Sequence, residues 1–400
     1  MAKINIITPP FSRYRFSGGI WCILEYAHGL ASRGHNVTII PIHSSTFPEW
    51  FPKHVGTIVL NPTGVLLKDA ARYACQLFSR IIMSPGHLPK EAVRRLGDQL
   101  CMIRPAIFSY PVRLGIVDAY VMKVAPDAEI NIATSFETAR PVSLLSGRKF
   151  YFAQHFEPYF KNEFPYPAYT EEVALQSYRL GLRMIANSSW LRDMLCCEIK
   201  DQLVELCPNA IDHSVFSGEA KASSDKNKVI VISYGGRDAI WKGFREMAEA
   251  VAIARLGMPE YEIEWRVYGD AVLPPVNDVA RYVPLGFLAP KQLAEEYRKA
   301  DILLSASWYE SFPLFPLEAM ACGLAVITTQ LGTEEYARHG VTAEIVQPKS
   351  PQSIADGISH LIRDTVYRYL VALQGHRVSK QFTWERSISR LEDILFESST

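Results

Sequence analysis

"DILLSASWYESFPLFPLEAMACGLAVIT", residues 301–328, decides how this chain folds. Its apolar run at 302–305 predicts a buried strand, and the run at 324–328 predicts a second one. The segment between them predicts a helix that begins at Pro316, since proline suits the first helical position, and that ends at Gly323. Strand, helix and strand at this length indicate a parallel sheet with a right-handed crossover.

The same alternation extends over most of the 400 residues, which is more than one hydrophobic core usually holds. We therefore predict two doubly wound α/β domains, at residues 1–217 and 228–380. The small, charged stretch "SGEAKASSDKNK" at 217–228 predicts the linker. The last predicted element, at 381–400, is an amphipathic helix that packs back on the N-terminal domain. Ligands of open α/β sheets bind beyond the carboxyl ends of the strands.

Composition excludes several classes of protein. The formal net charge is zero, which argues against a nucleic-acid binder. No segment is apolar enough over the length of a bilayer span, and the first ten residues lack the pattern of a secretory signal. Seven cysteines are scattered without metal-ligand spacing, so we expect reduced thiols and a cytoplasmic location.

Several well-known motifs are absent from the sequence. There is no G-x-G-x-x-G, no P-loop and no G-x-S-x-G. Neither H-E-x-x-H nor paired C-x-x-C occurs, and no two aspartates flank a single residue. We therefore expect no metal and no cofactor, so protein cations or helix ends must neutralise any diphosphate that leaves here.

Two glutamates stand at the ends of an uncharged stretch. Glu310 falls in the loop beyond the carboxyl end of the strand at 302–305, and Glu318 is predicted in the first turn of the following helix, where the dipole favours a carboxylate. The run between them leaves backbone N–H groups near a helix start, which suits anions and hydroxyls. The alternative is two surface glutamates near a helix cap.

Two cations follow another predicted strand. In "SYGGRDAIWKGF", residues 233–244, Arg237 comes after paired glycines, and Lys242 precedes the glycine that opens a helix. Fixed cations at this place stabilise the charge that develops on a leaving diphosphate. The alternative is a solvated arginine and lysine at a helix start.

Residues 310–323 resemble the E-x7-E signature of the retaining GT-B glycosyltransferases of family four. The chain keeps the glutamates and most of the pattern around them but has Ser311 and Pro313 at positions that are commonly glycine; the residues kept are Glu310, Phe312, Leu314, Glu318, Ala319, Met320, Ala321 and Gly323. The resemblance implies a GT-B fold, in which two Rossmann-like doubly wound domains face each other across a deep cleft. It implies an acceptor-binding N-terminal domain and a C-terminal domain that binds the nucleotide-sugar.

The same resemblance assigns roles to residues. Glu310 would contact hydroxyls of the donor sugar and Glu318 the ribose, while Arg237 and Lys242 resemble the family's phosphate grip. The paired glycines Gly18 and Gly19 resemble its N-terminal glycine loop. The remaining residues of the implied donor site are Phe312, Pro313, Leu314 and, near the base, Gly286.

The stretch "YFAQHFEPYF", residues 151–160, follows another predicted strand. Together with "ATSFETA" at 133–139, it looks like the WsaF-type rhamnosyltransferases of bacterial cell-surface glycan assembly. This likeness makes Gln154, His155 and Glu157 candidates for acceptor contacts, with His155 suited to proton handling near neutral pH. The alternative is a structural histidine.

These observations lead to one functional hypothesis. We expect a retaining transferase that moves a hexosyl or deoxyhexosyl group, with dTDP-L-rhamnose as the favoured donor, to a hydroxyl of a glycan or lipid-linked glycan during polysaccharide biosynthesis. A sugar-nucleotide epimerase or a phosphorylase on the same fold is the alternative, and a catalytically silent carbohydrate- or lipid-binding module is a third. Basic residues between 68 and 123 predict either solvated helix faces or peripheral contact with anionic lipid at the inner face of the membrane.

Overall fold

The structure is a computed structural model, and it describes residues 1–11, 17–42, 45–59, 110–163, 167–200, 202–221, 227–236, 239–269 and 280–397. The chain divides into two compact units. The first contains Met1–Ile185, Leu195–Glu205 and Leu395–Thr400, and the second contains Ala186–Met194 and Leu206–Ile394.

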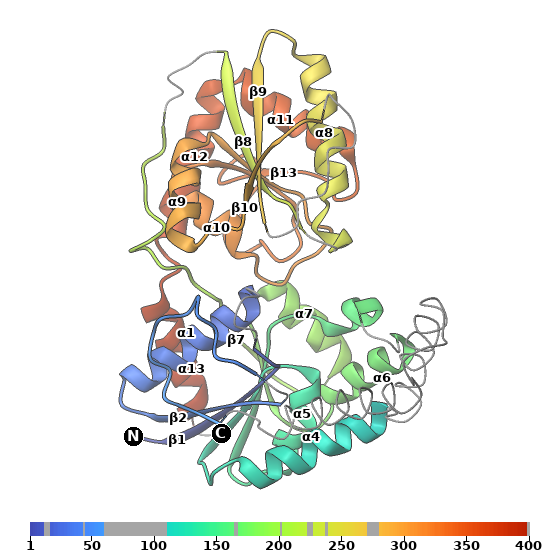
Figure 1. The fold of residues 1–400 in the computed structure, drawn as a ribbon, viewed down its shortest axis with the longest axis vertical. Coiled ribbons are helices and arrows are strands. Elements are labelled where there is room, and N and C mark those ends of the chain that lie inside the picture. The colour runs from blue at the N-terminus through green and yellow to red at the C-terminus, as the bar shows by residue number, and fades with distance from the viewer. Residues whose placement is uncertain are drawn as a thin grey trace, which may run out of the picture. The chain divides into compact units, whose positions relative to one another are not determined.

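The first unit is an α/β unit built around one sheet (Figure 1). Within the described residues its strand order is β3-β2-β1-β4-β5-β6-β7. The elements, in chain order, are β1 (Lys3–Thr8), α1 (Gly18–Ser32), β2 (Asn36–Pro41), β3 (Thr57–Ile58), α4 (Tyr110–Val124), β4 (Ile130–Ala133), α5 (Phe136–Leu144), β5 (Arg148–Ala153), η1 (Glu157–Glu163), α6 (Pro167–Ser177), β6 (Arg183–Ala186), α7 (Ser189–Glu198) and β7 (Val204–Leu206).

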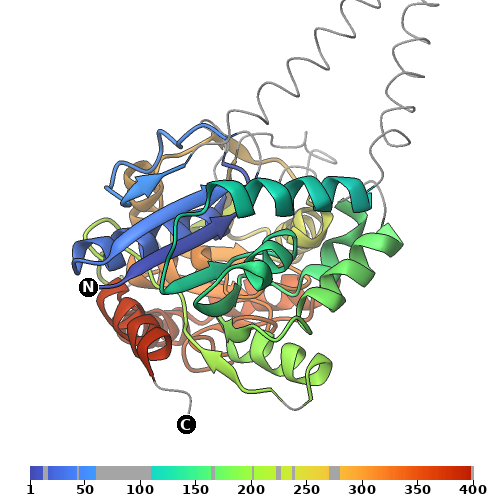
Figure 2. The ribbon, with the colours of Figure 1, turned by 90° about the horizontal axis from the view of Figure 1, so that it is seen from below.

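The central strands of this sheet are buried along almost their whole length. β1 pairs in parallel with β2 and β4, and β4 pairs in parallel with β5. Every residue of β4 is buried, as expected for parallel strands whose two faces are both covered. The helices α4 and α5 contact each other and lie side by side in Figure 2.

The second unit repeats this architecture. Within the described residues its sheet has the order β10-β9-β8-β11-β12-β13, and each neighbouring pair is parallel. The elements are β8 (Lys228–Tyr234), η2 (Ile240–Lys242), α8 (Phe244–Gly257), β9 (Glu262–Tyr268), β10 (Val283–Gly286), α9 (Pro290–Lys299), β11 (Ile302–Ser305), α10 (Leu314–Ala321), β12 (Ala325–Thr328), β13 (Glu344–Ile345), α11 (Pro351–Arg363), α12 (Thr365–Ser379) and α13 (Trp384–Phe396).

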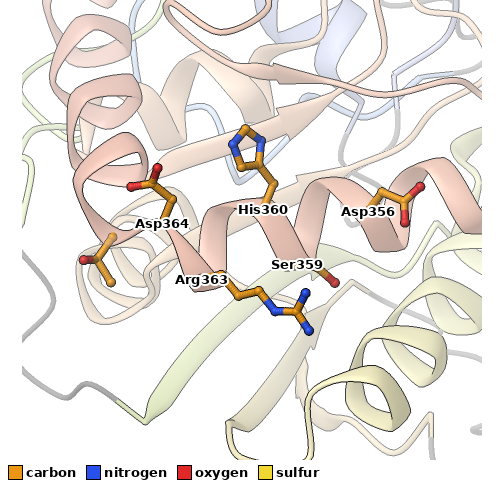
Figure 3. A pocket seen from close by; sticks show the side chains of 6 residues that line it. Asp356, Ser359, His360, Arg363 and Asp364 are labelled. Atoms are coloured by element: carbon orange, nitrogen blue, oxygen red, sulfur yellow. The ribbon is translucent and has the colours of Figure 1, made fainter.

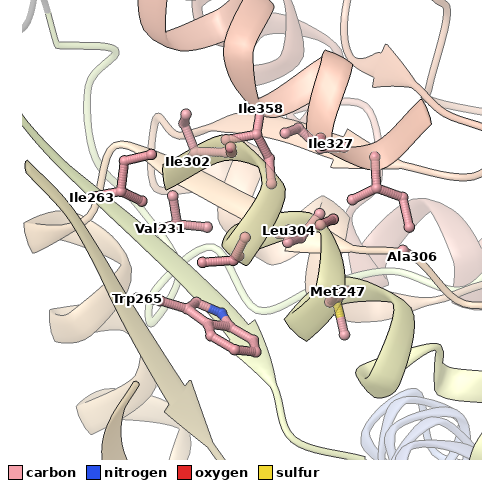
Figure 4. Close-up of a cluster of buried hydrophobic side chains, with 14 of the residues drawn as sticks. Val231, Met247, Ile263, Trp265, Ile302, Leu304, Ala306, Ile327 and Ile358 are labelled. Carbon is pink, nitrogen blue, oxygen red and sulfur yellow. The ribbon is translucent and has the colours of Figure 1, made fainter. Parts of the chain in front are cut away.

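Two hydrophobic clusters cover the two faces of the second sheet. Consecutive strand residues alternate between them: Val231 packs with α8 and α11, whereas Ile232 packs with α9 and α10. Figure 4 shows the first cluster, in which Trp265, Met247 and Ile358 meet from a strand and two helices. Figure 1 shows α8 on one side of β8 and β9, and α9 and α10 on the other. The sheet is therefore anchored on both faces, which fixes where its strands end.

The structure agrees with the predicted strands and helices around the candidate site, and it differs from the sequence prediction in several places. The helix after β11 begins at Leu314 and not at Pro316, because Pro313 is the extended residue that precedes it. The helices α4, α5, α6, α7, α11 and α12 and the short strand β13 were not predicted. Gly18 and Gly19 are the first two residues of α1 and do not form a turn before it.

The predicted domain limits at 217 and 228 remain a prediction, as does the packing of the C-terminal helix on the N-terminal domain. Residues 206–217 group with the second unit. In that unit, a Cβ atom on Gly218 would overlap with the carbonyl oxygen of Cys322. Among the described residues, none of the helices combines the length and hydropathy that a bilayer span requires.

Candidate functional site

The candidate site lies at the carboxyl ends of the strands of the second unit. Because β9, β8, β11 and β12 are parallel neighbours, the segments that follow them meet at one edge of the sheet. Those segments are Gly235–Gly236 after β8, Gly269 after β9, the stretch 306–313 after β11 and the stretch 329–336 after β12.

Lys242 and Glu310 form an ion pair across this edge, between Lys242 Nζ and Glu310 Oε1. Their side chains keep 24% and 13% of their surface exposed, so the pair is partly shielded from water and still reachable. The two residues are 68 positions apart, and the neighbouring strands β8 and β11 bring them together. In this arrangement the ammonium group can bind a phosphate, and the carboxylate beside it can accept hydrogen bonds from hydroxyl groups.

Backbone packing holds this ion pair in place. The N–H of Trp308 donates to the carbonyl of Trp241 over 2.7 Å, which joins the segment after β11 to η2. Gly243 has a φ of +70°, and a Cβ atom there would overlap with the carbonyl oxygen of Ala306. Glycine is therefore required immediately after Lys242, because both the backbone conformation and the close approach exclude a side chain.

Glu318 occupies a different environment. It is the fifth residue of α10 and not part of its first turn, contrary to the sequence prediction. Only 9% of it is exposed, and its Oε2 has no hydrogen-bond partner within the described part of the chain. Burial raises the pKa of the Glu318 carboxyl to about 8. Near neutral pH this side chain is therefore mostly protonated.

The buried phenols of Tyr268 and Tyr297 lie within electrostatic range of Glu318. Their hydroxyl oxygens are 2.8 Å apart and share a hydrogen bond. Burial raises the pKa of both phenols, and the charge that Glu318 would carry adds to that effect. An acid next to two un-ionised phenols can donate a hydrogen bond as well as accept one.

The residues between the two glutamates support the site from behind. Phe312 is 6% exposed and meets the ring of Tyr336 edge-on at 5.5 Å. The carbonyl of Pro313 accepts a hydrogen bond from the Tyr336 hydroxyl over 2.7 Å. Leu314, the first residue of α10, is partly buried and packs against the hydrophobic cluster between the sheet and the helices α9 and α10. The structure therefore places these three residues as the support of the segment that carries Glu310.

Gly286 ends β10 with a φ of +69°, and no atom of the described residues lies within 4 Å of a Cβ atom built on it. Its carbonyl accepts a hydrogen bond of 2.9 Å from the N–H of Gly269, which follows β9. The next residue, Phe287, keeps 49% of its surface exposed. An exposed aromatic ring and an open glycine at this edge suit contact with a planar base.

In the first unit, Gly18 and Gly19 also have open space around them. Apart from the helix's own backbone, no atom of the described residues lies within 4 Å of a Cβ atom built on either residue. The N–H of Trp21 donates to the carbonyl of Ser17 over 2.9 Å, so the helix is hydrogen-bonded from its first turn. Among the described residues, no side chain blocks the approach of a ligand to the start of α1.

The three acceptor candidates follow β5 in the first unit. Gln154 and His155 are partly exposed, and the His155 ring meets Phe160 edge-on at 4.2 Å. Glu157 is engaged within its own unit: it accepts a hydrogen bond from the Tyr151 hydroxyl and one of 2.9 Å from the N–H of Phe136. Burial raises the pKa of Glu157 to about 8. Glu157 thus ties η1 to the start of α5.

Some predicted features lie outside the described residues. Arg237 is one of them, and so is the part of the basic region from 68 to 109. The remainder of that region belongs to α4, whose last turn carries Lys123.

Sequence reasoning missed the segment 329–336 after β12, which packs directly on the backbone of Glu310. A Cβ atom on Gly332 would overlap with the carbonyl oxygen of Glu310. The available signal was its position, since "TQLGTEEY" follows a strand that is parallel to β11 and ends at the same edge. Two consecutive glutamates, Glu334 and Glu335, belong to this segment.

A separate open depression lies where α11 meets α12 (Figure 3). His360 and Arg363 line it from α11, and Asp364 lies between the two helices. None of the predicted site residues contributes to it. The described residues also contain no group of three or more histidine, cysteine or acidic side chains arranged to hold a metal ion.

Comparison with known proteins bears on the fold and on the family of one segment. Residues 229–364 match the family described as "Glycosyl transferases group 1". The solved structure of HepE from Anabaena in complex with UDP-glucose is similar over 99% of both chains, with a TM-score of 0.69 and 17% identity. WaaG, a glycosyltransferase involved in lipopolysaccharide biosynthesis, is similar over 99% of this chain and 100% of its own, with a TM-score of 0.65 and 13% identity. The fold is GT-B.

Among curated proteins, the D-inositol 3-phosphate glycosyltransferase of Paenarthrobacter aurescens (strain TC1) is 27% identical over 248 residues. The match covers 56% of this chain and 60% of that relative's length, so the chain spans less than two thirds of it. The prediction of two Rossmann-like sheets with a GT-B fold is confirmed. The segment 229–364, which matches the group 1 glycosyltransferase family, contains both Lys242 and Glu310.

Proposed function

We propose that the protein is a glycosyltransferase that moves a hexosyl or deoxyhexosyl group from a nucleotide-sugar to an acceptor hydroxyl. The Lys242–Glu310 ion pair carries this proposal, because it lies at the ligand-binding edge of the GT-B sheet and inside the segment that matches the family. In the free protein each side chain neutralises the other. A bound donor would supply Lys242 with phosphate oxygens and Glu310 with sugar hydroxyls.

The chemistry proceeds with retention in this proposal. The bond between the anomeric carbon and the phosphate oxygen breaks, the acceptor oxygen bonds to the same carbon from the same face, and the departing phosphate takes the acceptor's proton. Lys242 and Arg237 stabilise the charge that develops on the diphosphate. The protonated carboxyl of Glu318 exchanges hydrogen bonds with the ribose hydroxyls.

Other residues take supporting roles in the proposal. The N–H groups at the start of α1, at Gly18 and Gly19, approach the diphosphate. Gln154 and His155 contact the acceptor, and Glu157 holds the segment that carries them. Gly286 lies near the base.

For the donor we propose dTDP-L-rhamnose, and for the acceptor a glycan or lipid-linked glycan in bacterial cell-surface polysaccharide assembly. The likeness of residues 133–139 and 151–160 to WsaF-type enzymes supports this choice. The activity of WaaG, in lipopolysaccharide biosynthesis, is of the same kind. An inositol phosphate is the second candidate acceptor, favoured by the name of the curated relative.

We also propose that transfer needs no metal, because Lys242 and Arg237 would supply the positive charge; activity that survives EDTA would support this. At the membrane, we propose a peripheral location on its cytoplasmic side through the basic residues between 68 and 123. Co-sedimentation with vesicles that contain anionic lipid, compared with neutral vesicles, tests that contact.

Lys242→Ala tests the central proposal. We expect the rate of sugar transfer from dTDP-L-rhamnose or UDP-glucose to fall at least about 100-fold, since one fixed cation at the leaving group is lost. Lys228→Ala is the matched control, because Lys228 also pairs with carboxylates, Glu262 and Glu264, at the amino end of β8. Equal turnover by both variants would refute the role of Lys242. Incubation with the donor alone tests the epimerase alternative, because an epimerase would produce isomerised sugar nucleotide without an acceptor.

A further inference from the structure

The segment 329–336 carries a carboxylate for which the functions considered so far give no role. The segment is internally fixed: the hydroxyl of Thr333 donates to the carbonyl of Thr329 over 2.8 Å, and the hydroxyl of Thr329 donates to the carbonyl of Ser307 over 2.6 Å. The second bond joins the segment after β12 to the one after β11. The two segments therefore form one rigid edge.

Gly332 and Tyr336 tighten this connection. Gly332, with a φ of +82°, lies so close to Glu310 that any Cβ atom would overlap with the backbone of Glu310 and Ser311. The hydroxyl of Tyr336 donates to the carbonyl of Pro313 over 2.7 Å. Groups held by residues 332–336 consequently keep a constant position relative to Glu310.

Glu334 is held only by its own segment. Burial raises the pKa of its carboxyl, and hydrogen bonds from the backbone of Glu334, Gly332 and Thr333 partly oppose that effect. Its Oε2 is buried and has no hydrogen-bond partner among the described residues, and no cation in that part of the chain pairs with it. One side of the carboxylate is thus fixed, and the other has an unused acceptor.

The neighbouring Glu335 is used differently. Its Oε1 accepts a hydrogen bond from the N–H of Ser189, the first residue of α7, which satisfies one of the free donors at that helix start. This contact gives Glu335 a structural role. The Oε2 of Glu335, like that of Glu334, has no hydrogen-bond partner among the described residues, but within them Glu334 has no contact comparable to the one that Glu335 makes with Ser189.

A third observation places Glu334 in the same electrostatic environment as the two signature glutamates. Burial is the largest cause of the raised pKa of Tyr336, and the negative charges of four carboxyls raise it further: Glu310, Glu335, Glu334 and Glu318. One phenol therefore lies within range of all four carboxyls. A desolvated carboxylate oxygen without a partner is costly, unless a ligand supplies a donor to it.

We infer that Glu334 is a specificity-determining residue for the donor sugar, and that its free oxygen accepts hydrogen bonds from sugar hydroxyls beside those that Glu310 binds. This rests on the proposed function. A nucleoside diphosphate has no hydroxyls at the position of the sugar, so the contribution of Glu334 belongs to the sugar and not to the nucleotide. At this position Glu334 would distinguish sugars by the arrangement of their hydroxyls, because a carboxylate accepts hydrogen bonds from hydroxyls and repels other anionic groups.

Two matched pairs of ligands test this inference by calorimetry: UDP with UDP-glucose, and dTDP with dTDP-L-rhamnose. For the pair that the wild type binds, we expect Glu334→Ala to weaken binding of the sugar nucleotide about tenfold, as the loss of a hydrogen bond to a charged group implies. Binding of the free diphosphate should change less than about twofold. Glu334→Gln should give an intermediate loss, because its amide keeps one acceptor.

Glu335→Gln is the matched control, since it changes the same charge in the same segment. We expect it to lower the melting temperature through α7 and to leave the ratio of the two affinities unchanged. If Glu334→Ala weakens both ligands equally, or neither, the inference is wrong while the proposed function stands. If the folded wild type binds none of the four ligands, the proposed function itself is wrong.

Discussion

Glu310 and Glu318 are eight residues apart in one signature, yet the structure gives them opposite surroundings. Glu310 lies in the segment after β11, partly exposed and paired with the cation of Lys242. Glu318 is inside α10, nearly inaccessible and without a cationic partner in the described residues. The first is a charged group and the second is an acid whose pKa is raised to about 8 by burial. Sequence spacing alone therefore says little about charge state, which depends on partners and on solvent.

The largest expected effect comes from removing the charge at each position in turn. Glu310→Gln should lower the rate of transfer at least about 100-fold, because it takes the carboxylate from the sugar site and leaves Lys242 without its partner. Glu318→Gln should cost less than about tenfold, since a neutral amide resembles the protonated acid already present. Steady-state kinetics of both variants with the same donor measure this ratio. Equal losses would show that Glu318 acts as a charged group.

A second experiment uses a substitution that displaces the backbone of Glu310 and leaves both glutamates unchanged in sequence. In Gly332→Ala the new methyl group would overlap with the backbone of Glu310, at a φ of +82° that disfavours alanine. We expect the free energy of unfolding to fall by about 2 kcal/mol or more, together with a loss of transfer. Urea denaturation followed by tryptophan fluorescence measures the first quantity.

Gly286→Ala is the control for that substitution. Gly286 also has a positive φ, of +69°, but no atom of the described residues would lie within 4 Å of its Cβ, so we expect only the conformational cost of about 1 kcal/mol. A loss of stability as large as that of Gly332→Ala would mean that steric overlap with Glu310 is not the reason for the glycine at 332.

Much of this fold could be predicted from the sequence, because its strands and helices follow local patterns. The helix "FREMAEAVAIARLG" occupies residues 244–257 as its periodicity indicates, and the position of Glu310 beyond β11 is as predicted. The predicted start of α10 was wrong because the sequence has two prolines near it, Pro313 and Pro316, and either is compatible with a helix start. Pro316, third in the helix, is tolerated there since the first four N–H groups need no helical acceptor.

Other features depend on contacts between distant residues. Lys242 reaches Glu310 because β8 and β11 are neighbours in the sheet. The order of strands in a sheet cannot be inferred from the local sequence around Lys242 or around Glu310. The raised pKa values of Glu318 and Glu157 follow from burial, which single-sequence patterns do not measure. The helix α11 could have been found, because Ser350 caps it, Pro351 begins it and its apolar residues recur at helical spacing.

The last effect concerns pH, and it tests the charge state of Glu318. A carboxyl whose pKa rises from its ordinary value near 4.5 to about 8 on folding binds more protons in the folded state, so stability is highest below pH 4.5 and falls as the pH rises toward 8. One such group contributes at most about 1.4 kcal/mol per pH unit. Because Glu157 has the same shift, the wild type should lose stability steadily over this range.

Glu318→Gln removes one of these titrations, and the slope of unfolding free energy against pH should become shallower by up to about 1.4 kcal/mol per pH unit, as urea denaturation at several pH values would measure. Glu249→Gln, which alters an exposed residue of α8, should leave the slope unchanged. An unchanged slope in Glu318→Gln would mean that Glu318 is ionised in the folded protein despite its burial. The difference between the two signature glutamates would then be one of position alone and not of charge.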